Sequence, residues 1–175
     1  MNVSRFVFNP FGENTYILWD DSTKEAAIVD PGMSSAAEND AVDKFIAEKG
    51  LKLTHLVNTH MHIDHAIGNG HIMEKYGLVC ECNETDNYLA ERLTAQAQMF
   101  GIPFHGKNIA VGKHLADNSE INIGDEKLQV LYVPGHTKGH IALYSATSSF
   151  VLTGDALFQM SIGRTDLPGG NFNEL

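Results

Sequence analysis

The sequence predicts an α/β fold, and three observations support this prediction. In the first half of the chain, short strand-like runs alternate with stretches that have helical spacing. From Glu120 onward, the pattern changes to consecutive strands separated by turns. The length of 175 residues suits one domain, residues 1–175, with a single core, because domains most often contain roughly 100–150 residues.

Three strands and a helix are expected in the N-terminal part of the chain. The strands are predicted at residues 5–8, 15–19 and 25–29. Asp30-Pro31-Gly32 has turn chemistry and closes the third strand. Residues 36–49 place apolar side chains at helical spacing, and Gly50 ends that helix.

The alternation of strand and helix continues up to residue 100. Residues 54–59 predict a strand that leads directly into a cluster of polar side chains. A helix ending near Tyr76, a strand at 78–82 and a second helix at 84–100 follow it. Further strands are expected at 120–123, 127–133, 140–144 and 150–153, with Gly124-Asp125 as a tight turn.

Composition and charge exclude several classes of protein. With 43% hydrophobic and 19% charged residues, the chain has the composition of an ordinary globular protein. The formal net charge is −10 and lysines and arginines form no cluster, which argues against nucleic acid as a partner. The N-terminus lacks the apolar core of a secretory signal, and no apolar run approaches the ~20 residues of a membrane span. A cytoplasmic location is therefore expected, with Cys80 and Cys82 as reduced, packed thiols.

His60, His62, Asp64 and His65 place three imidazoles and a carboxylate within six residues. These ligand types suit zinc, iron or manganese. His60 and His62 are two residues apart on an extended segment, so both can reach one ion, whereas Asp64 and His65 can point at a neighbouring position. The pattern therefore predicts a site for two ions. A histidine-rich surface loop is the alternative, but it gives no reason for a buried strand to end in this cluster.

Two further segments carry candidate ligands after a strand: Gly135-His136-Thr137 and Gly154-Asp155. Together with the first cluster they resemble the HxHxDH, GHT and GD motifs of the metallo-β-lactamase superfamily. The resemblance runs from about Phe6 to Glu174 and includes Asp30-Pro31-Gly32. It implies a four-layer αββα sandwich.

The resemblance also implies a ligand set and a mechanism. His60, His62 and His136 would hold metal 1, Asp64 and His65 would hold metal 2, and Asp155 would bridge the two. Two zinc ions are expected, with iron or manganese also compatible with these ligands. A hydroxide that bridges the metals would be the nucleophile, so Asp64, His65 and Asp155 are the expected catalytic residues. Consistent with this mechanism, the chain contains no Gly-x-Ser-x-Gly elbow.

Three other residues have two interpretations each. Asp30 either accepts a hydrogen bond from a ligand histidine or only closes its turn. His140 either supports the ligands or has a structural role, because the matching position of the family does not bind metal. Arg164 either binds a substrate carboxylate or braces its loop by pairing with Asp166, and we favour the pair.

Residues 163–170 look like the small glyoxalase II-like hydrolases and also like persulfide dioxygenases. The leading prediction is a thioesterase whose substrate is a small-molecule, glutathione-type thioester such as S-lactoylglutathione. The first alternative is a mononuclear iron persulfide dioxygenase that acts on glutathione persulfide and uses His60, His136 and Asp155. The second alternative is a metal-binding module without turnover.

The last residues suggest a chain that continues further. Residues 171–174 have the form of a helix N-terminus, with Asn171 as the cap. Two-metal members of the superfamily supply one more histidine to metal 2 from a later segment, and no residue after His140 matches it. We therefore expect a C-terminally truncated domain that lacks its last strand and helix and whose second metal site is short of one ligand.

Overall fold

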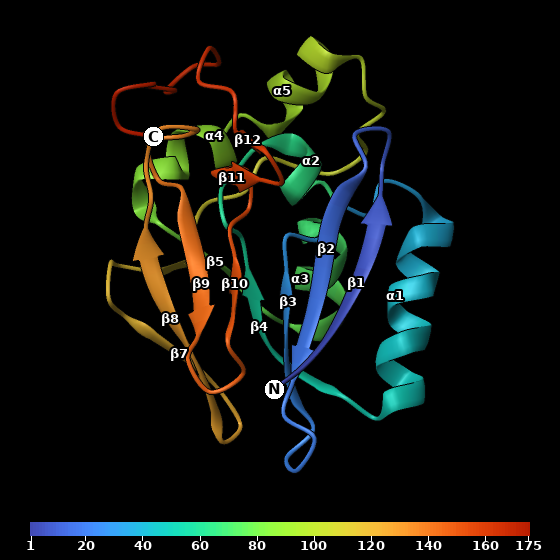
Figure 1. The fold of residues 1–175 in the computed structure, drawn as a ribbon. Helices are drawn as coiled ribbons and strands as arrows, with labels where there is room; N and C mark the ends of the chain where they lie inside the picture. The colour runs from blue at the N-terminus through green and yellow to red at the C-terminus, as the bar shows by residue number, and fades with distance from the viewer.

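The computed structural model describes residues 1–175 and contains two β-sheets that face each other (Figure 1). One sheet has the strand order β1-β2-β3-β4-β5-β6, and the other has the order β10-β9-β8-β7. The strands are β1 (Asn2–Phe8), β2 (Glu13–Trp19), β3 (Glu25–Val29), β4 (Lys52–Val57), β5 (Cys80–Cys82), β6 (Lys113–His114), β7 (Glu120–Ile123), β8 (Glu126–Tyr132), β9 (Ile141–Ser145), β10 (Phe150–Leu152), β11 (Leu157–Phe158) and β12 (Ser161–Ile162). The helices are α1 (Ala36–Lys49), α2 (Ile63–Ala66), α3 (Asn69–Tyr76), the 3₁₀ helix η1 (Glu84–Asp86), α4 (Asn87–Ala90) and α5 (Leu93–Phe100).

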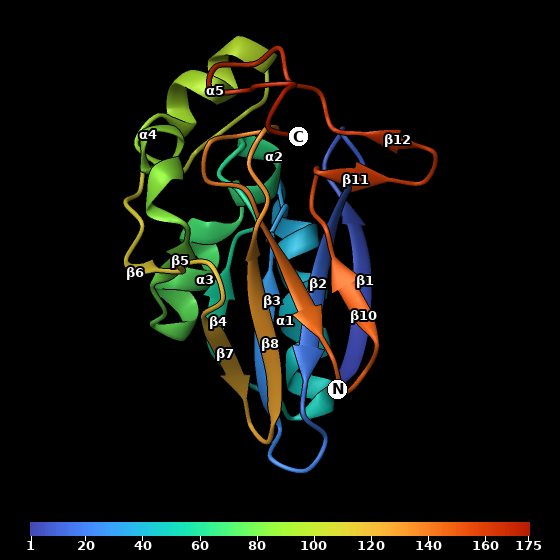
Figure 2. The same cartoon turned by 60° about the vertical axis from the view of Figure 1, so that its left-hand side comes forward.

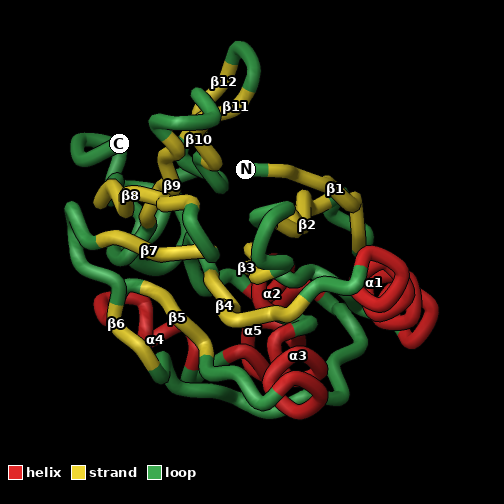
Figure 3. The backbone as a smooth tube through the Cα atoms, turned by 90° about the horizontal axis from the view of Figure 1, so that it is seen from below, coloured by secondary structure: helices red, strands yellow, loops and turns green.

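The helices lie on the outer side of the six-stranded sheet, and the four-stranded sheet covers its inner side (Figure 3). The expected α/β fold is confirmed, as two facing sheets, a separate two-stranded sheet of β11 and β12, and one helical layer. No helix covers the outer face of the β10-β9-β8-β7 sheet, so the fourth layer of the implied sandwich is not present in these residues. No helix has both the length and the apolar character needed to cross a membrane.

Helix α1 has the bounds that the sequence predicts. Ser35 caps its N-terminus by accepting a hydrogen bond from the backbone N–H of Glu38. Gly50 ends it in the left-handed region, with φ of 64°, where glycine carries no steric cost. Val42 and Ile46 are the buried residues of the helix, which fixes the face that packs on the sheet.

Apolar side chains fill both sides of the six-stranded sheet. Between the sheets, the buried cluster comprises Leu18, Ala27, Val29, Val57, Leu115, Ile121, Ile123, Leu128, Val130, Ile141, Leu143 and Leu152. A second cluster joins α1 and α3 to the opposite face of β2, β3 and β4. Cys80 and Cys82 are free, buried thiols in a third cluster under α4 and α5, as expected. Burial of these side chains is the main favourable contribution to the fold.

The topology brings the ends of β3 and β4 to one edge of the sheet. These strands are parallel, and Val29 pairs with Val57 in the register. The backbone N–H of Asp30 donates to the carbonyl of Val57 at 2.9 Å, which continues the pairing past the strand end. The turn at Asp30 and the loop after Asn58 therefore emerge together, at the strand edge where α/β sheets commonly bind ligands.

The sequence prediction of one helix over residues 84–100 is wrong. The segment divides into η1, α4 and α5, with a break at Glu91 and Arg92. The Gln96 side chain donates hydrogen bonds near this break. Its Nε2 donates to the carbonyls of Leu89 at 2.9 Å and Met61 at 3.1 Å. The carbonyl of Leu89, just before the break, therefore keeps a hydrogen-bond donor.

The expected helix start at the C-terminus is a hydrogen-bonded turn and no helix. The side chain of Asn171 accepts from the backbone N–H of Asn173 at 3.0 Å, which is the cap-like contact that the sequence suggests. Its backbone N–H donates to the carbonyl of Gly135 at 2.8 Å. The segment is thus tied to the loop that carries His136. The short strands β6, β11 and β12 were not expected, because two-residue strands carry no readable alternation.

Candidate metal centre

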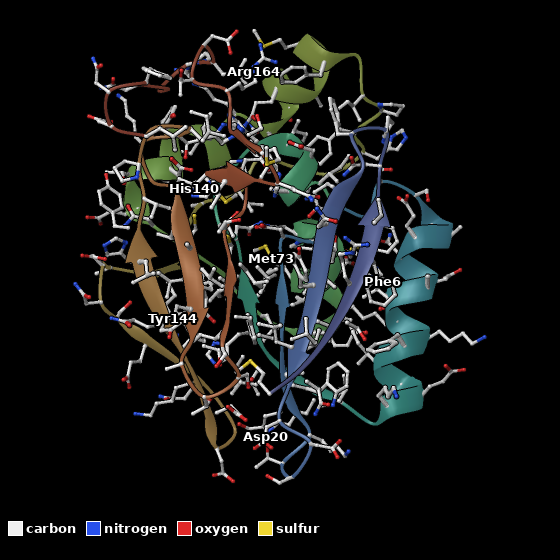
Figure 4. All side chains as sticks on the ribbon, in the orientation of Figure 1. Phe6, Asp20, Met73, His140, Tyr144 and Arg164 are labelled. Carbon is white, nitrogen blue, oxygen red and sulfur yellow. The ribbon has the colours of Figure 1, made fainter.

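The candidate ligands from three separate motifs meet at one end of the molecule. His60 and His62 follow β4, His136 lies in the loop between β8 and β9, and Asp155 follows β10. Figure 4 shows the neighbouring residues His140 and Arg164 at this same end, with Asp20 at the opposite end. The four histidines of the motifs are buried, so the cluster is part of the interior and is no histidine-rich surface loop.

The first group of candidate ligands is His60, His62 and His136, whose ligand atoms lie within 4.8 Å of one another. Nδ1 of His62 lies 2.9 Å from Nε2 of His136. Nε2 of His60 is buried and has no hydrogen-bond partner in the protein. A buried polar atom without a partner is costly, and a cation among three imidazole nitrogens would satisfy it. These residues therefore fit a first-row metal ion.

The second group is centred on His65. Its Nε2 lies 3.3 Å from Oδ1 of Asp155 and 3.6 Å from Oδ2 of Asp64. The other carboxylate oxygen of Asp155, Oδ2, lies 3.6 Å from Nε2 of His136 in the first group. The Asp155 carboxylate therefore spans the two groups, which is the arrangement that a bridging ligand requires.

The charge states of three candidate ligands, His60, His62 and Asp155, suit metal binding. Burial, followed by the neighbouring imidazole of His65, lowers the pKa of His60 well below its ordinary value. Burial, followed by the charge of His136, lowers the pKa of His62 to about 3. Burial opposes ionisation of Asp155, but its hydrogen bond with His65 and the nearby imidazoles outweigh that effect and lower its pKa to about 2. The imidazoles of His60 and His62 are thus neutral with free lone pairs, and the carboxylate of Asp155 is charged.

Asp30 links the two groups of candidate ligands. It reaches His60 through a hydrogen-bond relay that includes Thr59, and it contacts His65 directly. The Thr59 hydroxyl donates to Oδ2 of Asp30 at 2.7 Å, and the Thr59 backbone N–H donates to Oδ1 at 2.7 Å. Because that hydroxyl proton is already used, the hydroxyl oxygen accepts from Nδ1 of His60 at 3.1 Å. Nδ1 of His65 also lies 3.2 Å from Oδ2 of Asp30. The proton on Nδ1 leaves Nε2 of His60 as a lone pair directed at the candidate metal position.

His136 is oriented by a backbone group. Its Nδ1 donates to the carbonyl of Arg164 at 2.7 Å, which leaves Nε2 free to bind a metal. The Arg164 side chain forms two hydrogen bonds with Asp166, at 2.7 and 2.8 Å. The structure thus contains the expected Arg164–Asp166 pair.

His140 contacts the ligands without joining either group. Its Nε2 accepts a hydrogen bond from the backbone N–H of Asp155 at 3.1 Å. Its ring stacks on that of His60, with centroids 4.8 Å apart and an interplanar angle of 21°. His140 therefore contacts both the Asp155 loop and one face of His60.

A family model described as the metallo-β-lactamase superfamily matches residues 8–175. The chain belongs to the metallo-β-lactamase superfamily. The hydroxyacylglutathione hydrolase GloC of Haemophilus influenzae is 34% identical over 176 residues, which cover 100% of this chain and 81% of that protein. The human mitochondrial persulfide dioxygenase ETHE1 is 33% identical over 156 residues, which cover 89% of this chain and 52% of that protein. The crystal structure of TTHA1623 in a di-iron-bound form superimposes with a TM-score of 0.81 at 27% identity, covering 96% of this chain and 79% of that one.

Three supporting residues in this superfamily member were not found from the sequence. Thr59 forms the relay described above. Asp86 is fully buried and accepts from the backbone of Met61 at 3.1 Å, the hydroxyl of Thr137 at 2.7 Å and the backbone of Gly139 at 2.6 Å. Asp86 thereby ties the loop that carries His60 and His62 to the loop that carries His136. Asp86 lies in the segment 84–100 that the sequence predicts as one helix, and the helical pattern gives no signal of this role.

Gly163 is the third of these residues, and it lies against the backbone of Asp155. A Cβ atom at this position would lie 1.8 Å from the Asp155 carbonyl oxygen and 3.1 Å from Nδ1 of His136. Any side chain would therefore displace a candidate ligand.

Replacing Thr59 with valine is expected to lower metal affinity by about 10–100-fold, the usual cost of losing an outer partner of a ligand. Valine keeps the volume of threonine but offers no acceptor for Nδ1 of His60. Competition with a chromogenic chelator measures the affinity, and nitrogen NMR of the metal-free protein reports the His60 tautomer. Thr59→Ser should retain both properties. Thr54→Val is the matched control, since the Thr54 hydroxyl bonds only the carbonyl of Ala26. Unchanged affinity in Thr59→Val would contradict the relay.

Proposed function

We propose that this superfamily member is a metal-dependent thioesterase and that a glutathione thioester such as S-lactoylglutathione is its substrate. The observation that carries the proposal is the position of Asp155 between two candidate ligand groups. Asp64 and His65 complete the second group, and hydrolysis through two metals needs both groups. The similarity to the GloC hydrolase of H. influenzae supports the same choice of chemistry.

The side chains have separate roles in this proposal. His60, His62 and His136 would hold one metal, Asp64 and His65 the other, and Asp155 both. When bound, two cations would lower the pKa of a shared water towards neutrality and polarise the substrate carbonyl. Asp30 fixes the ring orientation of His60 through Thr59 and contacts His65 directly. A thiol leaving group with a pKa of about 8.5 departs without a strong acid, so the site needs no separate proton donor.

Zinc is the proposed metal, because tetrahedral sets of nitrogen and oxygen ligands suit it. Iron and manganese accept the same ligands, and the di-iron form of the similar TTHA1623 structure supports iron as a substitute. A cytoplasmic location for the reaction is part of the proposal.

Persulfide dioxygenation is the second candidate function. It would use His60, His136 and Asp155, and these three residues lie together in the structure. The identity to human persulfide dioxygenase ETHE1 favours it as the alternative. Under this alternative, His62 and Asp64 have no direct role in the chemistry. A metal-binding module without turnover is the third candidate.

Assays of the purified protein with one substrate of each class test the proposal. Protein loaded with zinc is expected to cleave S-lactoylglutathione, followed as loss of the thioester absorbance and release of thiol. Protein loaded with iron under nitrogen and then exposed to oxygen and glutathione persulfide should consume no oxygen. Oxygen uptake with one iron per chain and without thioester cleavage would establish the dioxygenase instead. Metal binding without either reaction would favour the module.

A further inference from the structure

We propose that the β11–β12 hairpin, together with Phe11 and Phe100, forms a subsite for an apolar acyl group of the substrate. The inference rests on the thioesterase function proposed above and specifies the substrate class. It predicts that the enzyme prefers thioesters of aliphatic or aromatic acids over those of small hydroxy acids.

The cavity beside the candidate metal ligands is lined by both polar and apolar side chains. Its volume is about 470 Å³, which is within the range of small-molecule sites. The lining includes His62, Asp64, His65, His136 and Asp155 and also the apolar side chains of Phe11, Phe100, Leu157 and Phe158. These four apolar residues are 50%, 37%, 57% and 44% exposed, so a bound ligand could still bury much of their surface.

The apolar side chains come from three segments that meet beside the metal centre. Phe11 lies in the turn between β1 and β2, and Phe100 is the last residue of α5. Their rings make an edge-to-face contact with centroids 5.9 Å apart. Leu157 and Phe158 form β11, which begins two residues after Asp155. An acyl group held at the metal centre therefore has an apolar surface directly next to it.

The hairpin projects from the body of the molecule (Figure 2). Leu157 pairs with Ile162, and Phe158 pairs with Ser161, so each strand has only the other as its neighbour. The Thr153 hydroxyl donates to the carbonyl of Leu157 at 2.9 Å and fixes the base of the hairpin. Met160, in the turn, is 98% exposed and does not line the cavity. A substitution at Met160 therefore changes the hairpin without changing the cavity lining.

The charges along the cavity favour an apolar group over an anionic one. Arg164 is the only lysine or arginine among the lining residues, and Asp166 already pairs with its guanidinium group. Asp30, Asp64 and Asp155 also line the cavity, and burial raises the pKa of Glu13, the fourth acidic residue there, to about 9. A carboxylate next to the hairpin would find no free cation there, whereas a hydrocarbon chain would be removed from water.

The test compares three thioesters of the same thiol: S-lactoyl-, S-hexanoyl- and S-phenylacetylglutathione. The native enzyme should have a higher kcat/KM for the hexanoyl and phenylacetyl substrates. In Phe158→Ala and Leu157→Ala, kcat/KM for these two should fall by roughly tenfold, mainly through KM, because a few methylene contacts are lost. S-Lactoylglutathione should be affected less than about twofold, since its acyl group is small and polar. Met160→Ala, on the same hairpin, and Phe172→Ala, an exposed phenylalanine outside the cavity, are the matched controls.

Binding of the product acids gives a second measurement that does not depend on turnover. Hexanoate should bind the metal-loaded protein more tightly than acetate by calorimetry, and Phe158→Ala should remove that difference. Equal use of all three thioesters, with equal effects of the variants on each, would overturn the subsite and leave the thioesterase function intact. If no thioester is cleaved, the proposed function fails, and the comparison of hexanoate with acetate then decides the subsite alone.

Discussion

Replacing His60 with alanine is expected to abolish turnover and to lower metal affinity by more than about a hundredfold. Loss of an outer partner of a ligand already costs up to about a hundredfold, and loss of the ligand itself should cost more. His60 is fully buried, and its Nε2 has no partner in the protein. It is also the ring whose orientation Thr59 and Asp30 fix. Loss of this imidazole removes a donor from the first group and a neighbour from His65, whose ring centroid lies 4.2 Å away.

Metal content by emission spectrometry and cleavage of S-lactoylglutathione measure this prediction. Circular dichroism shows whether the variant remains folded. His105→Ala is the matched control, because His105 is exposed and lies outside both ligand groups. A His60→Ala protein with native activity and native metal content would remove His60 from the site, and the assignment of the whole cluster would fall with it.

The sequence predicted the fold class and most strands because these depend on local patterns. The helix at residues 36–49 is the clearest case, since the apolar spacing and Gly50 are both local signals. The predicted helix at 84–100 failed for the opposite reason. Its break is accompanied by a hydrogen bond from Gln96 to the carbonyl of Met61, and no local pattern encodes a contact between residues so far apart in the chain.

The same distinction applies to the site. The residues proposed as ligands have side chains and spacings that are recognisable in the sequence, and the structure brings them together. Asp30 and His140 were recognised as candidate supports, but Thr59 and Asp86 were not, because a threonine before a histidine or a single aspartate has many ordinary roles. Only the fold shows that Asp86 joins two loops and that Gly163 lies against Asp155. The sequence predicts which groups do the chemistry, and three-dimensional packing determines how precisely they are held.

Replacing Asp64 with asparagine is expected to reduce thioester hydrolysis by about a hundredfold or more while one metal ion per chain stays bound. Asn keeps the shape of the side chain but removes the charge that the second group would offer to a cation. The first group should be retained, because His60, His62 and His136 do not depend on Asp64 for any hydrogen bond. Asp21→Asn, on the exposed turn after β2, is the matched control.

This variant also separates the two candidate reactions. Dioxygenation through His60, His136 and Asp155 would survive the change, whereas hydrolysis through two groups would not. Stoichiometric metal titration, thioester cleavage and oxygen uptake should be measured on the same preparation. We expect binding of the second ion to weaken and hydrolysis to disappear together, because Asp64 and His65 face the same position as Oδ1 of Asp155. Native hydrolysis with a single bound metal would show that the second group is dispensable and would refute the two-metal proposal.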